Sequence, residues 1–299
     1  MNPLVMPYID CAALTLQAVA DCLAQTLSPF PILLIDNGSQ DEGRGLADDL
    51  MRAHPDRILT WHHLPPFPSL STTWNRALRF CWEAGADHAL VVNNDVRLAP
   101  WTYELLLEVQ QKTGGGFVTA VGVKEEQFAL YQQQVADDPA FARVALGIPT
   151  ESRKDGIRPE GYSYGGPDFS CFLITKACHT KYQFDEGFVP AYHEDCDFHR
   201  RMMLGGDGTN IFGVNIPFLH YGSATTNRSP EHARAFSPRF EQCKQYYIRK
   251  WGGSVGAEQF IRPADATSIR PGASNPELQA WVAAGRGVRE LLGDGVHES

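Results

Sequence analysis

The sequence predicts an α/β fold with a mostly parallel central sheet, and three features of the chain lead to that prediction. Apolar runs of strand length alternate with segments whose apolar residues recur at helical spacing. Two of these runs stop abruptly at turns rich in Asp and Asn, where open α/β sheets bind ligands. With 43% hydrophobic and 20% charged residues among 299, the composition is that of a globular protein able to bury a large core.

The alternation is clearest in the first third of the chain. Four apolar runs of strand length lie at residues 4–8, 31–35, 58–62 and 89–92. Apolar residues recur at helical spacing in 14–23, 46–51 and 74–82. Pro100 then begins another helix, at a position where its missing N–H costs nothing. Strand, helix and strand in succession are typical of a parallel sheet.

The second half of the chain is less regular. Residues 127–160 are polar and contain three prolines, so we expect a mobile excursion over the site. Ordered segments are expected again at 162–176, 184–204 and 211–221. Apolar positions over 240–251 predict a late helix, and beyond residue 252 only 278–292 has a helical pattern.

The bulk properties exclude several classes of protein. No apolar run approaches the roughly 18 residues of a membrane span, and the first residues lack the pattern of a signal peptide, so we expect no stable membrane insertion and a cytoplasmic location. Seven cysteines without a CxxC pair argue against a disulfide framework or a zinc site. A formal net charge of −9 argues against a broad basic surface for nucleic acid, although Arg200–Arg201 or Arg249–Lys250 would suit a local groove.

Polar residues at two strand ends are the first candidates for chemistry. Asp95 follows a wholly apolar strand and is the best candidate for a metal ligand, because carboxylate oxygens suit divalent cations. The segment from Asp36 to Ser39 follows the earlier strand in the same way. Asn and Asp are also common in ordinary turns, so each segment alone is equally consistent with a strand-end turn.

A second group of candidates lies around residues 185–201. Glu194, Asp195 and Asp197 crowd the beginning of a predicted helix. Acids are favoured at helix N-termini by the helix dipole, which explains one or two of them. The aromatic and His-rich approach to them is less easily explained in that way. His220 ends a later apolar strand, and a single strand-end histidine is usually structural.

Together and in this order, these motifs resemble the inverting, family 2 type of glycosyltransferases with the GT-A fold. The resemblance covers roughly residues 4–252 and rests on residues 7–10, 33–41, 74–77, 91–96, 184–188, 193–200 and 247–252. The sequence Asn93-Asn94-Asp95 is a variant of the family's DxD motif, with Asn in the first place. In residues 7–10 the order of the family's first-strand motif is altered.

The resemblance implies a metal-dependent transfer of a sugar from a nucleoside-diphosphate sugar, most simply a UDP-sugar. It implies that Asp95 and His220 hold Mn2+ or Mg2+, that Asp195 is the catalytic base and that Glu194 is its neighbour in the acceptor site. The residues implied in nucleotide-sugar binding are Pro7, Tyr8, Asp10, Asp36, Asn75, Asn93, Asn94 and Gly166.

The resemblance also implies a division of the chain. Residues 1–225 would form the GT-A catalytic domain, with the nucleotide-sugar half at about 1–125 and the acceptor half at about 126–225. Residues 226–299 would form a helical C-terminal extension. The sequence does not assign a role to 127–160 or 253–299, or an oligomeric state.

Rival functions stay open at this point. A sugar-phosphate nucleotidyltransferase usually has an early Gly-rich loop with a basic residue, which this chain lacks, and no GxGxxG follows the first strand as in a dehydrogenase. A non-catalytic nucleotide-sugar or glycan-binding protein is a second alternative. The acceptor is equally open: a glycan, a lipid-linked saccharide, a protein side chain or a hydroxylated DNA base. The acidic balance weakly disfavours DNA.

Overall fold

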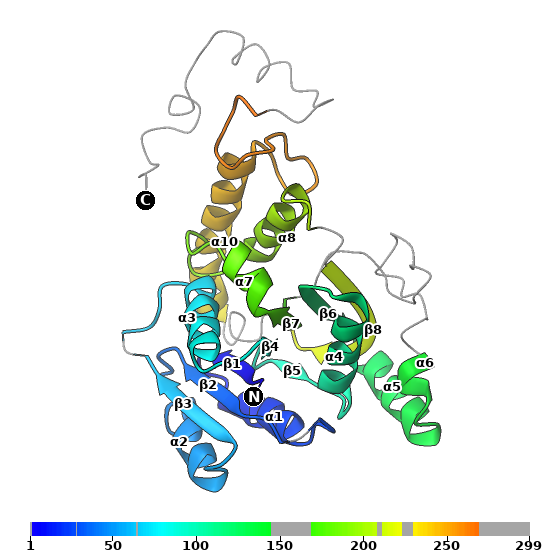
Figure 1. Ribbon diagram of the computed structural model, residues 1–299. Helices are drawn as coiled ribbons and strands as arrows, with labels where there is room; N and C mark the ends of the chain where they lie inside the picture. Colours follow the sequence, from blue (N-terminus) through cyan, green and yellow to red (C-terminus); the bar gives the residue numbers. More distant parts are fainter. Residues whose placement is uncertain are drawn as a thin grey trace.

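A single eight-stranded sheet, covered by helices on both faces, organises the described part of the chain (Figure 1). The computed structural model describes residues 2–27, 29–63, 65–144, 169–207, 211–222 and 230–268. The strand order is β3-β2-β1-β4-β7-β6-β8-β5. The strands are β1 Leu4–Tyr8, β2 Ile32–Asp36, β3 Ile58–His62, β4 His88–Val92, β5 Val96–Arg97, β6 Phe117–Val123, β7 Cys171–Thr175 and β8 Ile211–His220.

The helices connect these strands and pack on the sheet. They are α1 Ala12–Leu23, α2 Gly43–Ala53, α3 Leu70–Glu83, α4 Thr102–Thr113, α5 Glu125–Asp137, α6 Phe141–Val144, α7 Lys176–Tyr182, α8 Glu194–Leu204 and α10 Pro230–Trp251. One face of the sheet packs with α1, α2, α4 and α5, and the other with α3, α7 and α8. This is the α/β architecture that the sequence predicts.

Strands β1, β2 and β4 bring the polar loops to one edge of the sheet. They pair in parallel, with Tyr8 opposite Asp36 and Val5 opposite Val91. All five residues of β1 and of β2 are buried, as expected for parallel strands covered on both faces. Because carboxyl ends of parallel strands point the same way, the loops after Tyr8, Asp36 and Val92 leave the sheet together.

Pro7 lies inside β1, where a proline can remove a ladder hydrogen bond. The backbone N–H of Leu4 donates to the carbonyl of Pro31, on the β2 side of the strand. The backbone groups of successive residues face alternate sides, so those of residue 7 face β4. Pairing with β4 ends at Val5, so the missing N–H of Pro7 leaves no ladder bond unmade.

The expected excursion at 127–160 is wrong in its first part. Residues 125–137 form α5, which buries Phe128, Tyr131 and Val135 against the sheet. Those three positions lie at i, i+3 and i+7, the spacing of one helix face, but the many polar residues between them hid the pattern. Residues 145–168 lie outside the described residues, as does the helix expected at 278–292.

The late helix is α10, and it begins ten residues earlier than its apolar pattern. Cys243, Tyr247 and Trp251 pack with Phe188 in a separate small core. The expected domain boundary near residue 225 falls among residues 223–229, outside the described set. None of the described helices is both long and apolar enough to cross a membrane.

Candidate active site

The edge strand β5 brings Asp95 and His220 together. Val96 of β5 pairs with His220 of β8, and the backbone N–H of Tyr221 donates to the carbonyl of Asp95 at 3.0 Å. The His220 Nε2 consequently lies 3.5 Å from the Asp95 Oδ1. Ser170, which the sequence did not single out, lies with its Oγ within 3.4 Å of both ring nitrogens of His220. The expected convergence of Asp95 and His220 is thus present in the structure.

The donor atoms at this point fit a divalent cation that also binds substrate oxygens. Asp95 is buried, and carboxylate oxygen with imidazole nitrogen is a donor set that Mn2+ accepts. Next to it, the buried Oδ1 of Asn93 has no hydrogen-bond partner in the structure. Among the described residues, no set of three His, Cys, Asp or Glu side chains could hold a metal. Two protein ligands suit a cation whose remaining positions are filled by phosphate and water.

The loops that begin at Tyr8 and Asp36 hold each other in place. The Asp36 Oδ1 accepts a hydrogen bond from the backbone N–H of Ser39 at 2.8 Å, and the hydroxyl of Ser39 accepts one from the backbone of Asp10 at 2.8 Å. The Tyr8 hydroxyl donates to the carbonyl of Gly43 at 2.9 Å. These residues therefore set the shape of the expected nucleotide-binding loops, whatever they contact in addition.

His62 was missed by the sequence analysis and lies beside Asp36. Its Nδ1 is 3.3 Å from the Asp36 Oδ2 and its Nε2 is 2.8 Å from the Asp48 Oδ1. Partial burial alone would lower the pKa of His62, but hydrogen bonds to Asp48 and Asp36 raise it above its ordinary value. A histidine at the end of β3 has no distinguishing local pattern, so only the pairing of β2 with β3 reveals it.

Asn94 anchors the loop between β1 and α1. Its Nδ2 donates to the Thr15 Oγ1 at 2.9 Å and reaches the carbonyl of Asp10 at 3.4 Å. Asp10 and Cys11 both have positive φ angles, 54° and 57°, which are costly for residues other than glycine. Such backbone strain persists where neighbouring bonds over-determine it, as Asn94 does here.

The Glu194–Asp195 pair begins α8 after another strained segment. Tyr192 and His193 have φ angles of 88° and 70°. Glu194 is only 6% exposed, and its Oε2 has no hydrogen-bond partner in the structure. Burial, and then the charge of Asp195, raise the pKa of Glu194 to about 8. Asp195 is half-buried, and its Oδ1 accepts a hydrogen bond from the backbone N–H of Cys196.

Residues 169–170 contact both β8 and α8. Ser170 contacts His220, and the ring of Phe169 packs on Phe198, one turn after Glu194, with centroids 5.7 Å apart. The backbone of Ser170 also accepts a hydrogen bond from the N–H of Asn93 at 2.9 Å. Residues 169–170 therefore link the metal-type pair, Asp95 and His220, to the helix that begins with Glu194 and Asp195.

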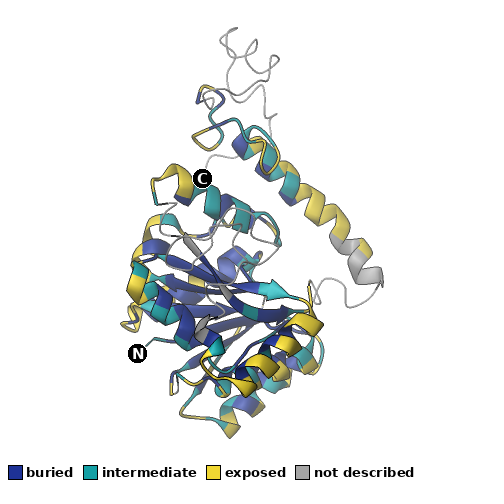
Figure 2. Cartoon of the chain, turned by 90° about the vertical axis from the view of Figure 1, so that its right-hand side faces the viewer, coloured by how far each residue is buried: buried dark blue, intermediate teal, exposed yellow. Residues whose placement is uncertain are grey.

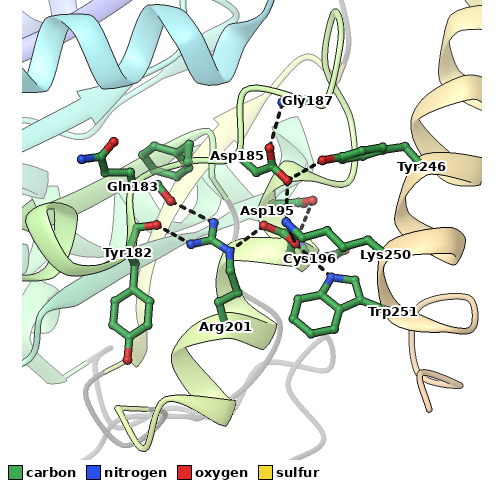
Figure 3. A network of polar contacts seen from close by, with 12 residues as sticks. Tyr182, Gln183, Asp185, Gly187, Asp195, Cys196, Arg201, Tyr246, Lys250 and Trp251 are labelled. Atoms are coloured by element: carbon green, nitrogen blue, oxygen red, sulfur yellow. Dashed lines mark hydrogen bonds and ion pairs between the residues drawn. The ribbon is translucent and has the colours of Figure 1, made fainter. Parts of the chain in front are cut away.

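Asp197 ties α8 to α10 and is fully buried. Arg201 of α8 and Lys250 and Trp251 of α10 converge at this junction (Figure 3). Its Oδ2 pairs with the Nε of Arg201 at 2.7 Å. Its Oδ1 accepts from the Lys250 ammonium at 2.6 Å and from the Trp251 indole at 2.9 Å. Lys250 also pairs with Asp185. Burial alone would raise the pKa of Asp185, but Lys250 and the hydrogen bonds that Asp185 accepts hold it below its ordinary value.

Asn75 has a different environment from the one expected of a nucleotide-sugar ligand. Its Nδ2 donates to the carbonyl of Phe184 at 2.8 Å and to the Glu186 Oε1 at 2.9 Å. Its Oδ1 accepts from the backbone of Phe184 and lies 3.1 Å from the His179 Nε2. Burial lowers the pKa of His179 to about 4, so this imidazole is neutral at pH 7. Because the amide of Asn75 is saturated by protein partners, it positions residues 184–186.

A sequence profile described as "Glycosyl transferase family 2" matches residues 4–176, more than half of the chain. The chain belongs to this family. It is therefore a glycosyltransferase, as the sequence predicts. The matched region contains the loops at Asp10, Asp36 and Asp95, whereas Glu194, Asp195 and His220 lie beyond it. The assignment of those three residues rests on their geometry, and Gly166 lies outside the described residues.

Solved structures of glycosyltransferases share the GT-A fold of this family member. TarS 1–349 from S. aureus, in complex with UDP, is 12% identical with a TM-score of 0.50, over 82% of this chain and 69% of that one. Glucosyl-3-phosphoglycerate synthase from Mycobacterium tuberculosis, with Mn2+, UDP and its product, is 16% identical with a TM-score of 0.52, over 85% and 80%.

A third structure with the same fold is the mannosyltransferase PcManGT from Pyrobaculum calidifontis with GDP-Man and Mn2+. It is 14% identical with a TM-score of 0.50, over 95% of this family 2 chain and 78% of that one. None of the curated protein sequences matches the chain.

Proposed function

We propose that this glycosyltransferase moves a sugar from a nucleoside-diphosphate sugar, preferably a UDP-sugar, to an acceptor hydroxyl with inversion at the anomeric carbon. The observation that supports it most is that residues 169–170 contact both regions: Ser170 lies against His220, the neighbour of Asp95, and Phe169 packs on Phe198 of α8, the helix that begins with Glu194 and Asp195. A site for a leaving diphosphate would thus adjoin a site for an attacking hydroxyl. On this proposal residues 1–225 form the catalytic domain and 226–299 the extension.

The metal-type pair is the natural place for the diphosphate. Asp95 and His220 would hold Mn2+ or Mg2+, which, when bound, neutralises charge that develops on the leaving phosphate oxygens. Asn93 is adjacent, and its unpartnered Oδ1 can accept a hydrogen bond from a ribose or sugar hydroxyl. The loops held together by Asp10, Asp36 and Asn94 would then enclose the nucleoside.

Asp195 is the residue that we assign as general base. As the acceptor oxygen forms a bond to the anomeric carbon, its O–H bond breaks and the proton passes to the Asp195 carboxylate. The bond from the anomeric carbon to the phosphate oxygen breaks on the opposite side, and the nucleoside diphosphate leaves with that electron pair. One displacement of this kind inverts the configuration, so an α-linked donor gives a β-linked product.

The donor nucleotide can be tested directly. Two of the three similar structures contain UDP and one contains GDP-Man, which supports a UDP-sugar first and a GDP-sugar second. The experiment screens UDP-, GDP- and dTDP-sugars with Mn2+ and measures the free nucleoside diphosphate that is released. We expect release from a UDP-sugar, and loss of release in excess EDTA. Full release in EDTA would remove the metal from the proposal, and no release from any donor would reject the function.

A further inference from the structure

Three ring-bearing side chains form a surface beside the Glu194–Asp195 pair. Tyr192 and Phe240 pack edge to face with centroids 5.0 Å apart, and His193 lies 5.5 Å from Phe240. Tyr192 and His193 directly precede Glu194, whereas Phe240 comes from α10. We refer to Tyr192, His193 and Phe240 as the aromatic surface.

Phe240 is the uncovered end of an otherwise buried stripe. Phe240, Cys243, Tyr247 and Trp251 lie on one face of α10, at helical spacing. The last three are at most 2% exposed, while Phe240 is 42% exposed. Residues 237–242 are exposed in succession, and the exposed half of α10 stands away from the sheet (Figure 2). A large apolar side chain left open at the end of a buried stripe, next to a catalytic pair, suggests a binding contact.

The backbone conformation and the polar atoms of residues 192–194 also indicate a binding contact. Tyr192 and His193 are held in the left-handed region, which is unfavourable for both residue types and is concentrated at functional sites. Among the described residues, the buried Nε2 of His193 and the Oε2 of Glu194 have no hydrogen-bond partner. Buried polar atoms are rarely left unpaired in native structures, so both atoms are positioned to bond with a ligand.

We propose that the aromatic surface is the acceptor subsite and that the acceptor is a neutral sugar ring; this rests on the proposed function. The apolar C–H face of a pyranose stacks on the exposed ring of Phe240 and the half-buried ring of Tyr192. Its hydroxyls bond with His193 and Glu194, and a further hydroxyl faces Asp195. A polyanion such as DNA is disfavoured, because Asp195 and Glu241 outnumber Lys244 among the charges that act on His193, in a chain of net charge −9.

The test separates acceptor binding from donor use. The acceptor probes are methyl glycosides of glucose, galactose, mannose and N-acetylglucosamine, a Ser/Thr-containing peptide, and duplex DNA with hydroxymethylated cytosine. Nucleoside diphosphate release is measured with and without each. We expect only glycosides to raise the rate above acceptor-free hydrolysis. Stimulation by the peptide or the DNA alone would overturn the inference.

Two variants locate the subsite, and one matched variant controls for them. Phe240→Leu and Tyr192→Leu should raise the KM for the glycoside about two- to tenfold, the worth of an aromatic contact. Phe80→Leu, on a phenylalanine of α3 that is 47% exposed, should change neither this KM nor acceptor-free release. Equal KM values for Phe240→Leu and Phe80→Leu would overturn the inference.

A binding measurement without turnover distinguishes failure of the acceptor subsite from failure of the proposed function. Saturation-transfer NMR should detect the methyl glycoside on the wild-type protein and weaken in Phe240→Leu, without any turnover. If donors are never consumed but this difference is seen, the proposed function fails and the sugar subsite stands. If donors are consumed but no glycoside shows a Phe240-dependent signal, the subsite fails alone.

Discussion

Glu194 and Asp195 are neighbours in sequence, but the fold gives their carboxyl groups different surroundings. Glu194 is buried with an unpartnered oxygen, whereas Asp195 is half-buried at the first turn of α8. Two adjacent acids in unlike environments are well suited to unlike roles, one holding a proton and the other accepting one. The sequence shows the pair, but only burial by the surrounding chain separates their properties.

The base assignment predicts a selective loss of turnover. Asp195→Asn keeps the shape of the side chain but removes its ability to accept the hydroxyl proton. Turnover should fall by about 10²–10⁴-fold, with nearly normal binding of donor and metal by calorimetry. The residual product should keep the inverted linkage in its NMR spectrum. Near-normal turnover would place the base elsewhere, and a retained configuration would overturn inversion.

The buried carboxyl of Glu194 predicts a pH-dependent cost to stability. Its pKa is raised to about 8 in the folded protein, so folding binds a proton between the unfolded pKa near 4.5 and pH 8. Stability from this group is therefore complete below pH 4.5 and is lost as pH rises toward 8. Between pH 5 and 8, the free energy of unfolding of Glu194→Gln should rise by at least about 1 kcal/mol relative to that of wild type.

Urea unfolding across this pH range measures the effect. The control is Glu126→Gln, at an exposed glutamate of α5. Its curve of unfolding free energy against pH should run parallel to that of wild type. If the Glu194→Gln curve also runs parallel, the carboxyl does not hold its proton in the folded state.

At the scale of elements, much of the fold could be predicted because apolar periodicity reflects burial. The strands at 4–8, 31–35, 58–62 and 89–92 agree with β1 to β4 within one residue at each end. α5 was missed because its buried face has only three residues, and the exposed Leu130 interrupts the pattern. Contacts such as Asn75 with Glu186 could not be predicted, because they join residues more than 100 positions apart.

The junction of α8 with α10 gives a prediction at this scale. Asp197→Ala leaves the Lys250 ammonium and the Trp251 indole without this carboxylate, in a site closed to water. Removing one partner of a buried ion pair costs about 3–5 kcal/mol, so the free energy of unfolding should fall by that amount. Amide exchange should rise first in α10.

An exposed ion pair provides the control for this junction. Glu108→Ala breaks the i, i+4 pair with Lys112 on α4, where Lys112 is 60% exposed. This change should cost less than about 1 kcal/mol. Equal losses in both variants would mean that Asp197 does not anchor α10.

Over the whole molecule, parts distant in sequence meet at the proposed site. Asp95 and His220 converge because β5 pairs with β8, 125 residues later in the chain by their numbering. Strand-end residues predict such a meeting in outline, since sheets gather their carboxyl ends. The sequence did not predict Ser170 or His62, whose positions depend on strand pairing alone.

This convergence predicts that nucleotide and cation stabilise the folded protein together. UDP with Mn2+, near 100 times the dissociation constant, should add about 2.7 kcal/mol, which raises Tm by about 4 °C in a protein of this size. Each ligand alone should raise Tm by less, because on the proposed function Asp95 and His220 would hold the cation that neutralises the phosphate charge. Asp95→Asn should remove the Mn2+-dependent part of the shift, whereas Asp49→Asn, at an exposed acid of α2, should keep it. A UDP-induced shift that is the same in EDTA as in Mn2+, measured by scanning calorimetry on wild type, would show that the nucleotide binds without the cation.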